Sequence, residues 1–311
     1  MSKLAFLFPG QGSQSVGMMA AYGDGPIIRA TFAEASEVLG LDLWRMVGEG
    51  PGEELDLTVN TQPVMLAAGV ACYRLWREMG GREPDCMAGH SLGEYTAMTC
   101  AGALDFADAL RLVRLRAEAM QSAVPEGQGA MAAILGLDDD AVRALCAEAA
   151  GDEVVAAVNF NSPGQVVIAG HRPAVERAMA LAKARGAKRA LALPVSVPSH
   201  CALMQPAADR LRQALASISV RAPRVRVIHN VDVAEHADAD AIRDALVRQL
   251  YQPVRWVETI RRMYADGVGL FAECGPGKVL AGLNKRILAD VPVLALADAA
   301  GMAQALAQIA N

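Results

Sequence analysis

The chain has 311 residues, 53% of them hydrophobic and 20% charged, and a formal net charge of -5 at pH 7. This composition excludes a disordered, collagen-like or coiled-coil protein. The length suits two domains, or one large domain that carries an insertion. The excess of acidic residues argues against a protein that binds nucleic acid.

No segment has the pattern of a membrane span or of a secretory signal. The longest uncharged stretch, residues 190–208, is interrupted by three prolines, and the apolar run after Lys3 is too short for the core of a signal peptide. We therefore expect a cytoplasmic protein. The 6 cysteines are scattered with no C-x-x-C pair, so neither a zinc site nor a disulfide framework is predicted.

Strand and helix patterns alternate in the first part of the chain. Leu4 to Phe8 is a short apolar run ended by Pro9-Gly10, as is typical of a buried parallel strand. A second short strand is predicted at residues 85–88. Helical spacing predicts helices at residues 26–39, 64–79, 94–101 and 105–123.

The next segment has a different order of elements. Its pattern predicts strands at residues 130–135, 154–160, 166–169 and 188–195, with helices at residues 138–150 and 173–185. This β-α-β-β-α-β order is that of a ferredoxin-like unit. Alternation then resumes, with strands at residues 225–230 and 269–273 and helices at residues 240–250, 257–266 and up to about 288. We therefore predict an α/β protein with a large subdomain, residues 1–127 and 198–311, an inserted ferredoxin-like small subdomain, residues 128–197, and a cleft between them.

Gly89-His90-Ser91-Leu92-Gly93 lies between a predicted strand and a predicted helix, which is the context of a nucleophile elbow. The turn is too tight for larger flanking residues, and it places the serine hydroxyl at the helix N-terminus. There the N–H group of Leu92 can face a developing oxyanion. A G-x-S-x-G pattern also occurs in plain strand-to-helix turns, but the strand and helix on either side favour a catalytic Ser91.

A serine hydroxyl needs a general base within hydrogen-bond reach. Position favours His200, which follows the return of the chain from the insertion and therefore lies at the proposed cleft. His229 ends a predicted strand, where a histidine is more often part of the core. No acidic residue is obviously placed to orient the base, so a triad and a dyad oriented by a backbone carbonyl both stay open. The remaining histidines are less well placed: His90, His171 and His236.

The predicted helix at residues 105–123 carries an arginine on its apolar face. At ~100° per residue, Arg111 and Arg114 lie on one side of this helix, whereas Arg116 lies on the other with Leu112 and Val113. A guanidinium directed into a core needs an anionic or strongly hydrogen-bonding partner, because it does not deprotonate. Three alternatives stay open: a buried structural pair with an Asp or Glu, a side chain that extends along the apolar face to the surface, and a bidentate clamp for the carboxylate of a substrate.

The loop after the first strand, Pro9-Gly10-Gln11-Gly12-Ser13-Gln14, invites comparison with a phosphate-binding loop. It lacks the third glycine of a dinucleotide-binding loop, and no Gly-Lys-Ser/Thr follows. We therefore reject a nucleotide site. The loop is expected instead to bring Gln11 over the strand ends, close to Ser91.

Five motifs occur in order along the chain. They are Pro9-Gly10-Gln11-Gly12-Ser13-Gln14, Gly89-His90-Ser91-Leu92-Gly93-Glu94, Asn159-Phe160-Asn161-Ser162-Pro163-Gly164, Pro198-Ser199-His200 and Gly275-Pro276-Gly277. Together these motifs are highly specific, and the sequence closely resembles the bacterial malonyl-CoA:acyl carrier protein transacylases over essentially its whole length. The resemblance implies an α/β-hydrolase-like core with a ferredoxin-like insertion, in agreement with the element order.

The resemblance also implies specific roles. Ser91 would be the nucleophile, His200 the general base and acid, and Arg116 the group that holds the malonyl carboxylate. The main chain near Gln249 would orient His200, which would account for the missing triad acid. The oxyanion hole would be formed by two groups, Gln11 and the N–H of Leu92.

The reaction so implied is a ping-pong acyl transfer through a malonyl-serine ester, in support of fatty acid biosynthesis. The expected partners are malonyl-CoA and the phosphopantetheine form of acyl carrier protein, with no metal or redox cofactor, no nucleic acid and no membrane, and a monomer is expected. Because the carrier protein of this family is acidic, it should dock on local basic pairs. The candidates are Lys188-Arg189 and Lys285-Arg286.

Other functions would use some of the same residues. A serine hydrolase or thioesterase would share Ser91 and His200 but transfer the acyl group to water, and the arginine clamp and the lack of an obvious triad acid favour transfer to a thiol. A non-catalytic subunit that binds carrier protein would not need Ser91, His200 and Arg116 together. The sequence does not separate fatty acid synthesis from polyketide synthesis or malonate decarboxylation.

Overall fold

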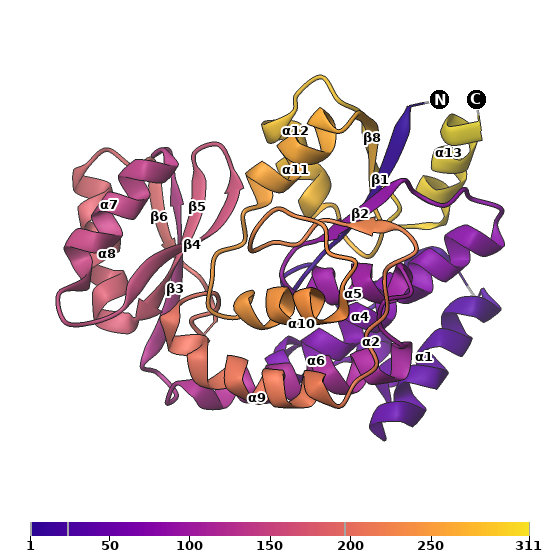
Figure 1. Cartoon of the computed structure of the whole chain (residues 1–311), viewed down its shortest axis with the longest axis horizontal. Helices are drawn as coiled ribbons and strands as arrows, with labels where there is room; N and C mark the ends of the chain where they lie inside the picture. The colour runs from indigo at the N-terminus through magenta and orange to yellow at the C-terminus, as the bar shows by residue number, and fades with distance from the viewer. Residues whose placement is uncertain (1, 24, 196, 311) are drawn as a thin grey trace.

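The computed structural model describes residues 2–23, 25–195 and 197–310. A mixed α/β fold is confirmed, with a parallel sheet and a separate antiparallel sheet (Figure 1). The parallel sheet has the strand order β7-β2-β1-β8-β9, and every adjacent pair in it is parallel. Its strands are β1 (Lys3–Phe8), β2 (Cys86–Gly89), β7 (Arg226–Val227), β8 (Val268–Glu273) and β9 (Val293–Ala295).

Strand β1 lies at the centre of this sheet and is buried on both faces. Leu4, Phe6 and Phe8 point into one hydrophobic core, and Ala5 and Leu7 point into another, as the two-residue period of a strand requires. The first core is shared with helices α4 (Thr58–Glu78), α5 (Leu92–Cys100) and α6 (Phe106–Ala123). The second core is shared with α11 (Trp256–Ala265) and α12 (Val279–Ile287). The continuous apolar strand β1 therefore lies between two layers of helices and packs against both.

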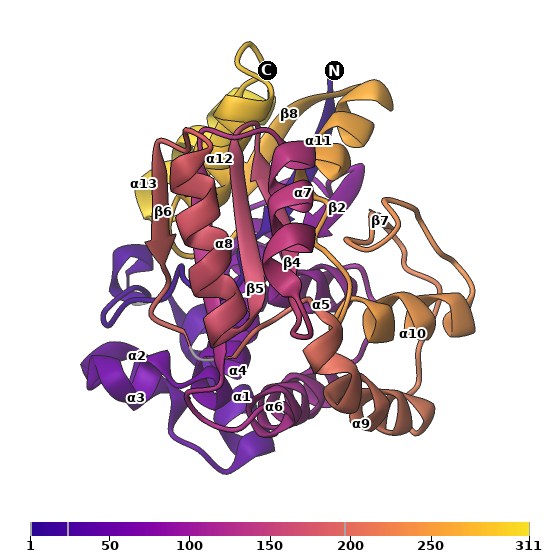
Figure 2. The ribbon, with the colours of Figure 1, turned by 90° about the vertical axis from the view of Figure 1, so that its left-hand side faces the viewer.

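The small subdomain is the predicted ferredoxin-like unit. Its antiparallel sheet has the order β4-β5-β3-β6 and consists of β3 (Gly129–Leu135), β4 (Val155–Ser162), β5 (Gln165–His171) and β6 (Arg189–Ala192). Helices α7 (Asp139–Ala150) and α8 (Arg172–Ala184) cover one face of the sheet (Figure 2). The other face is turned toward the large subdomain. Main-chain hydrogen bonds join the two parts, because Phe160 donates to Val254 O at 3.0 Å and Val254 donates to Val158 O at 2.8 Å.

The sequence patterns missed several helices. Those absent from the prediction are α2 (Leu43–Glu49), α3 (Gly52–Asp56), α9 (Gln205–Ala216) and α13 (Ala299–Ala310), whereas α1 (Pro26–Leu39) and α10 (Ala239–Arg248) lie where they were expected. Helix α4 begins six residues before its predicted start, with Pro63 inside it. Proline lacks the N–H group that would bond the Val59 carbonyl. Arg114 of α6 donates to that carbonyl instead, at 3.0 Å, so a tertiary contact stabilises a turn that the local sequence disfavours.

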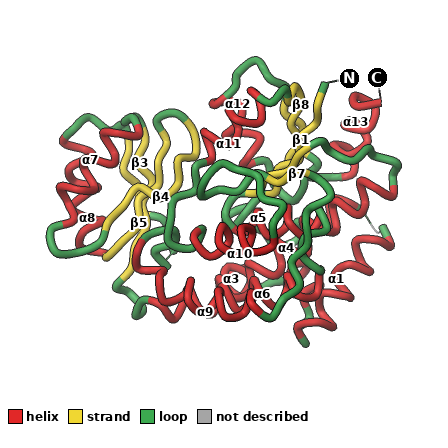
Figure 3. Tube along the Cα trace, viewed as in Figure 1, coloured by secondary structure: helices red, strands yellow, loops and turns green. Residues whose placement is uncertain are grey.

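Two predicted strands are shorter than expected. The strand predicted at residues 225–230 is limited to β7, because the main chain of Asn230 turns away to donate to a buried carboxylate, Glu94, at 3.0 Å. The strand predicted at residues 188–195 is limited to β6, and Leu193 and Val195 line a pocket instead. Figure 3 shows loops together with helices α11 and α12 between the two sheets. No helix in the described ranges is both long and apolar enough to cross a lipid bilayer.

Candidate active site

Ser91 stands at a sharp turn between β2 and α5, the strand-turn-helix context that the motif predicted. Its backbone angles are φ 53° and ψ -111°, which a serine adopts only where the surroundings enforce them. The flanking glycines are required by space. A Cβ atom on Gly89 would lie 1.8 Å from the carbonyl carbon of Gly93, and one on Gly93 would lie 2.0 Å from the carbonyl oxygen of Phe8. The turn is thus packed directly on the end of β1 and lifts the Ser91 hydroxyl into a pocket.

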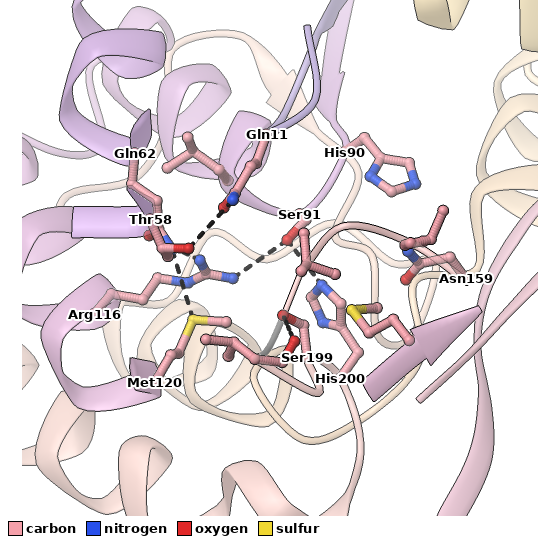
Figure 4. Close-up of a pocket in the computed structure, with 15 residues that line it drawn as sticks. Gln11, Thr58, Gln62, His90, Ser91, Arg116, Met120, Asn159, Ser199 and His200 are labelled. Atoms are coloured by element: carbon pink, nitrogen blue, oxygen red, sulfur yellow. Dashed lines mark hydrogen bonds between the residues drawn. The ribbon is translucent and has the colours of Figure 1, made fainter. Parts of the chain in front are cut away.

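The structure brings His200 to this hydroxyl. Its Nε2 lies 2.8 Å from Ser91 Oγ (Figure 4). Its Nδ1 lies 2.6 Å from the main-chain oxygen of Gln249. The main-chain N–H of His200 donates to Leu250 O at 3.0 Å, and its φ is 65°. The histidine therefore lies in a fixed orientation between a hydroxyl and a carbonyl.

The environment of His200 keeps its ring neutral. Burial lowers the pKa of His200 to about 3, and the positive charge of Arg116 acts in the same direction. A neutral ring has one N–H, and a carbonyl can only accept, so the proton is assigned to Nδ1, which donates to Gln249 O. Nε2 is then free to accept the proton of Ser91, as a general base must.

Arg116 is buried beside Ser91, with 1% of its surface exposed. Its Nη1 donates to Gln62 Oε1 at 2.9 Å, and its Nη2 donates to Gln249 Oε1 at 3.1 Å and to Ser91 Oγ at 3.3 Å. The guanidinium also lies over the Tyr95 ring, 5.3 Å from its centroid. Burial lowers the pKa of Arg116, yet an arginine stays charged in proteins.

No carboxylate of the described residues forms an ion pair with Arg116. All its hydrogen-bond partners are neutral amide or hydroxyl oxygens, and its Nε has no partner in the described part of the chain. A buried charge with neutral partners only is costly, and an anion that enters the pocket would relieve that cost. The arginine predicted on the apolar face thus lies in the core beside Ser91.

The other histidines do not contact Ser91. Each has a partner elsewhere: His90 with Asn161 Oδ1 at 2.7 Å, His171 with the Val154 N–H at 3.0 Å, His229 with Glu94 Oε1 at 2.7 Å and His236 with Asp232 Oδ2 at 3.0 Å. Burial lowers the pKa of His90 as well. Among the described residues, only His200 is therefore placed as a base for Ser91.

The pocket in front of Ser91 has a volume of about 150 Å³. Its mouth is bordered by the loop after β1, where the Gln11 carboxamide donates to Thr58 Oγ1 at 3.2 Å (Figure 4). Leu92 is the first residue of α5, so its N–H has no carbonyl to bond within the helix. Apolar side chains form much of the wall: Met120, Met131, Leu193, Val195 and Val197. The pocket is thus polar at its floor and apolar at its sides.

Sequence reasoning missed three side chains that hold the floor of the site. Gln62 and Asn230 were not singled out, and Glu94 was noted only as part of a motif. Their partners lie far away in the chain, 54 residues for Gln62 with Arg116 and 136 for Glu94 with Asn230. The one sequence signal for Glu94 was its position, because an acidic residue directly follows the G-x-S-x-G motif.

The basic pairs proposed for carrier docking are exposed. Lys188-Arg189 lies at β6 of the small subdomain, and Lys285-Arg286 lies in the last turn of α12. Arg286 Nη1 donates to Gln165 Oε1 of β5 at 2.6 Å, so this pair reaches the small subdomain. The docking role of both pairs stays a prediction.

A serine hydroxyl within hydrogen-bond reach of a neutral histidine, beside a buried cation, is the arrangement expected of an acyl-transferring protein, and comparison with known proteins agrees. The acyl transferase domain family matches residues 5–304. Malonyl CoA-acyl carrier protein transacylase of Escherichia coli K12 is 60% identical, over 98% of this chain and 99% of its own. The Bacillus subtilis protein of the same name is 46% identical, over 96% and 94%.

Solved structures of proteins with the same or a related name are also closely similar to this chain. The malonyl CoA-acyl carrier protein transacylase of Coxiella burnetii superposes with a TM-score of 0.98 at 51% identity, covering 100% of this chain and 98% of its own. A malonyl-transacylase solved in complex with the acyl carrier protein of a type II polyketide synthase has a TM-score of 0.97 at 56% identity, covering 99% and 100%. The chain therefore belongs to the malonyl CoA-acyl carrier protein transacylase family, and it is an enzyme of the acyltransferase class.

Proposed function

We propose that this chain moves the malonyl group from malonyl-CoA to the phosphopantetheine thiol of acyl carrier protein, through an ester on Ser91. The observation that carries the proposal is Arg116, a buried cation that has no carboxylate partner in the described part of the chain and lies 3.3 Å from the Ser91 hydroxyl. An acyl group that ends in a carboxylate supplies the missing anion. Guanidinium and carboxylate match in a planar, bidentate geometry.

In the first half-reaction, His200 Nε2 takes the proton of Ser91 while Oγ attacks the thioester carbon. The tetrahedral intermediate carries an oxyanion. The N–H of Leu92 and a donor of Gln11 are proposed to stabilise it. As the carbon–sulfur bond breaks, His200 gives its proton to the CoA sulfur, and the malonyl-serine ester remains.

In the second half-reaction, the thiol of the carrier protein replaces CoA. His200 removes the thiol proton, sulfur attacks the ester carbonyl, and the proton returns to Ser91 Oγ as the ester bond breaks. The same base thus works in both directions. The carbonyl of Gln249 would hold the ring and stabilise the imidazolium that forms in each step, as a triad acid does elsewhere.

The Gln11 donor is proposed to be its main-chain N–H group. Its side-chain amide already donates to Thr58. A main-chain donor is also independent of side-chain rotation, which suits a preorganised oxyanion hole. The proposed reaction needs neither a metal nor a redox cofactor, and its proposed role is to supply fatty acid biosynthesis.

Mass spectrometry of the protein mixed with malonyl-CoA tests the proposal most directly. A stable malonyl adduct on Ser91 that disappears when phosphopantetheinylated carrier protein is added, with malonyl carrier protein as the product, is the expected result. An adduct that decays to free malonate at the same rate with and without carrier protein would indicate a hydrolase. A protein that forms no adduct would be a binding subunit, and the proposal would be wrong.

A further inference from the structure

The buried carboxylate of Glu94 lies behind the nucleophile and takes no part in the steps above. It belongs to the first turn of α5 and has 0% of its surface exposed. Its Oε1 lies 2.7 Å from His229 Nδ1, and its Oε2 accepts hydrogen bonds from the Asn230 N–H at 3.0 Å and from Gln249 Nε2 at 2.9 Å. No lysine or arginine of the described residues forms an ion pair with it. Three groups therefore converge on one buried acid.

Gln249 connects this acid to the reacting groups. Its Oε1 accepts from Arg116 at 3.1 Å, while its Nε2 donates to Glu94 and, at 3.0 Å, to Ser91 O. A cation at one end and a carboxylate at the other fix which way the carboxamide points. The main-chain oxygen of the same residue holds His200. Holding the Gln249 side chain therefore holds the histidine.

Asn230 connects the acid to the elbow itself. Its Oδ1 accepts from the main-chain N–H of Ser91 at 2.8 Å, and its Nδ2 donates to Gly89 O at 2.8 Å. These two bonds bracket the strained turn that carries the nucleophile. Glu94 accepts a hydrogen bond from the Asn230 main chain. It therefore supports Ser91 through Asn230 and His200 through Gln249.

We propose that Glu94 is the positioning residue of this active site, an acid that supports the serine-histidine dyad at one remove through Gln249 and Asn230. A hydrogen bond to a charged acceptor is stronger than one to a neutral acceptor, so a carboxylate holds these neighbours more firmly than an amide would. The inference rests on the proposed function where acylation by malonyl-CoA is the readout. It explains how the site works without an acid in direct contact with His200.

A second buried carboxylate provides a matched control. Glu273, at the end of β8, has 0% of its surface exposed, and its oxygens accept from the N–H groups of Leu280 at 3.1 Å and Ala281 at 2.7 Å. It stabilises the start of α12 and contacts neither Gln249 nor Asn230. The same substitution at Glu273 and at Glu94 separates two effects. One is the effect of losing any buried carboxylate, and the other is the effect of losing the Glu94 carboxylate in particular.

The experiment compares Glu94→Gln and Glu94→Ala with Glu273→Gln. For each, we measure the unfolding temperature, kcat and KM for acylation by malonyl-CoA, and the rate at which a fluorophosphonate without a carboxylate labels Ser91. Glu94→Gln should lower kcat about tenfold, the difference between charged and neutral hydrogen bonds, and Glu94→Ala about 100-fold or more, since the members of a catalytic unit act together. KM should stay within about threefold, because Arg116 is also held by Gln62, which does not contact Glu94. Glu273→Gln should lower the unfolding temperature but leave the rates within about threefold.

Three outcomes would overturn the inference. They are a folded Glu94→Gln protein with kcat within about twofold of wild type, a loss expressed in KM alone, and an equal loss of kcat in Glu273→Gln. If Glu94→Ala does not fold, Glu94→Gln decides. If wild-type Ser91 takes the fluorophosphonate but no malonyl group, the proposed function fails on its own, and the labelling rates of the same variants still test Glu94.

Discussion

The two subdomains bury different kinds of side chain. The large subdomain has a set of buried polar groups around Ser91: Gln62, Glu94, Arg116, His200, His229, Asn230 and Gln249. In the described part of the small subdomain, Ser162 is the only buried polar side chain, and the core between its sheet and helices consists of alanine, valine, isoleucine, leucine, phenylalanine and cysteine. The residues proposed to carry out the reaction belong to the large subdomain, whereas the small subdomain contributes wall residues such as Met131 and Leu193.

This difference determines how each part should respond to substitution. Buried polar groups are stable only while every member has its partners, so removing one disturbs the others. Apolar wall residues act through shape and volume, and each contributes less. Changes in the large subdomain should therefore affect the reaction itself, and changes in the small subdomain should affect which acyl group or partner is accepted.

The largest effect is expected for the dyad. Ser91→Ala should abolish the acyl adduct, and His200→Ala should lower the acylation rate by at least about 1,000-fold. The double variant should lose little more than Ser91→Ala alone, because members of one catalytic unit are strongly non-additive. Rates of adduct formation by quenched-flow mass spectrometry measure this. A double variant far less active than either single variant would contradict a shared mechanism.

The next largest effect is expected for Arg116, on the selectivity between acyl groups. With an acetyl group bound, the buried guanidinium lacks its anion, and a stranded partner of this kind costs roughly 2 to 5 kcal/mol, about 30- to 5,000-fold in kcat/KM. Malonyl-CoA should be preferred to acetyl-CoA by that margin. Arg116→Ala should lower malonyl transfer steeply and acetyl transfer little, and Arg116→Lys, which keeps the charge but loses the planar fork, should restore only part of the malonyl rate. An unchanged malonyl-to-acetyl ratio in Arg116→Ala would assign the arginine a structural role.

Because His200 is buried, we expect the free energy of unfolding to depend on pH. Its folded pKa of about 3 lies below the usual 6.5, so protonation favours the unfolded chain. The contribution to stability is complete above pH 6.5 and is lost progressively as the pH falls toward 3. Between pH 7 and pH 5, this one group should remove about 2 kcal/mol from the free energy of unfolding. Denaturant unfolding of wild type and His200→Gln at both pH values measures it, and an equal loss in both proteins would contradict the assignment.

The same pKa predicts that acylation tolerates mild acid. An ordinary histidine base would be half protonated near pH 6.5, and kcat/KM for malonyl-CoA would fall below that value. Since His200 stays neutral, kcat/KM should be nearly constant from pH 8 to pH 5. A pH–rate profile with a midpoint near 6.5 would show that the base is far more exposed in solution.

Much of this architecture could be predicted from local patterns. The central strand and the elbow each depend on a few adjacent residues, and the β-α-β-β-α-β unit follows from the local patterns of its six successive elements. The place of Arg116 on the apolar face of its helix followed from helical periodicity, since its neighbours three and four residues away are apolar. Features that one element determines by itself were therefore accessible to sequence reasoning.

The features that were missed depend on distant partners. Helix α4 extends past Pro63 because Arg114 of another helix satisfies the freed carbonyl. The carbonyl that orients His200 was indicated by the family resemblance alone, because a main-chain oxygen leaves no mark on the residue type at Gln249. Glu94 was overlooked because its partners lie more than 130 residues away. The members of a buried polar network are brought together only by the tertiary structure, so they cannot be assigned before the fold is known.

A smaller effect is expected for the wall that the small subdomain contributes. Leu193→Ala should enlarge the pocket while leaving Ser91, His200 and Arg116 in place. The malonyl adduct should still form, and kcat/KM for the bulkier methylmalonyl-CoA should rise about tenfold relative to malonyl-CoA, the usual effect of one methyl group in an apolar pocket. Competition between the two thioesters measures this ratio. Complete loss of acylation would show that the wall also holds the dyad, which would contradict the division between the subdomains.

The smallest effect is expected at the exposed surface of the small subdomain. Arg189 lies on β6, the edge strand whose continuation leads into the pocket wall, whereas Lys183 lies on α8, which covers the opposite face of the sheet (Figure 2). If an acidic carrier protein docks near the pocket mouth, Arg189→Glu should slow malonyl transfer to it about 3- to 10-fold and weaken the salt dependence of that rate, since a charge at the rim of an interface acts mainly on association. Acylation by malonyl-CoA should be unchanged. Lys183→Glu makes the same change of charge on the same subdomain and should alter neither half-reaction. Equal losses in both half-reactions, or equal losses in the two variants, would show that Arg189 belongs to an ordinary solvated surface.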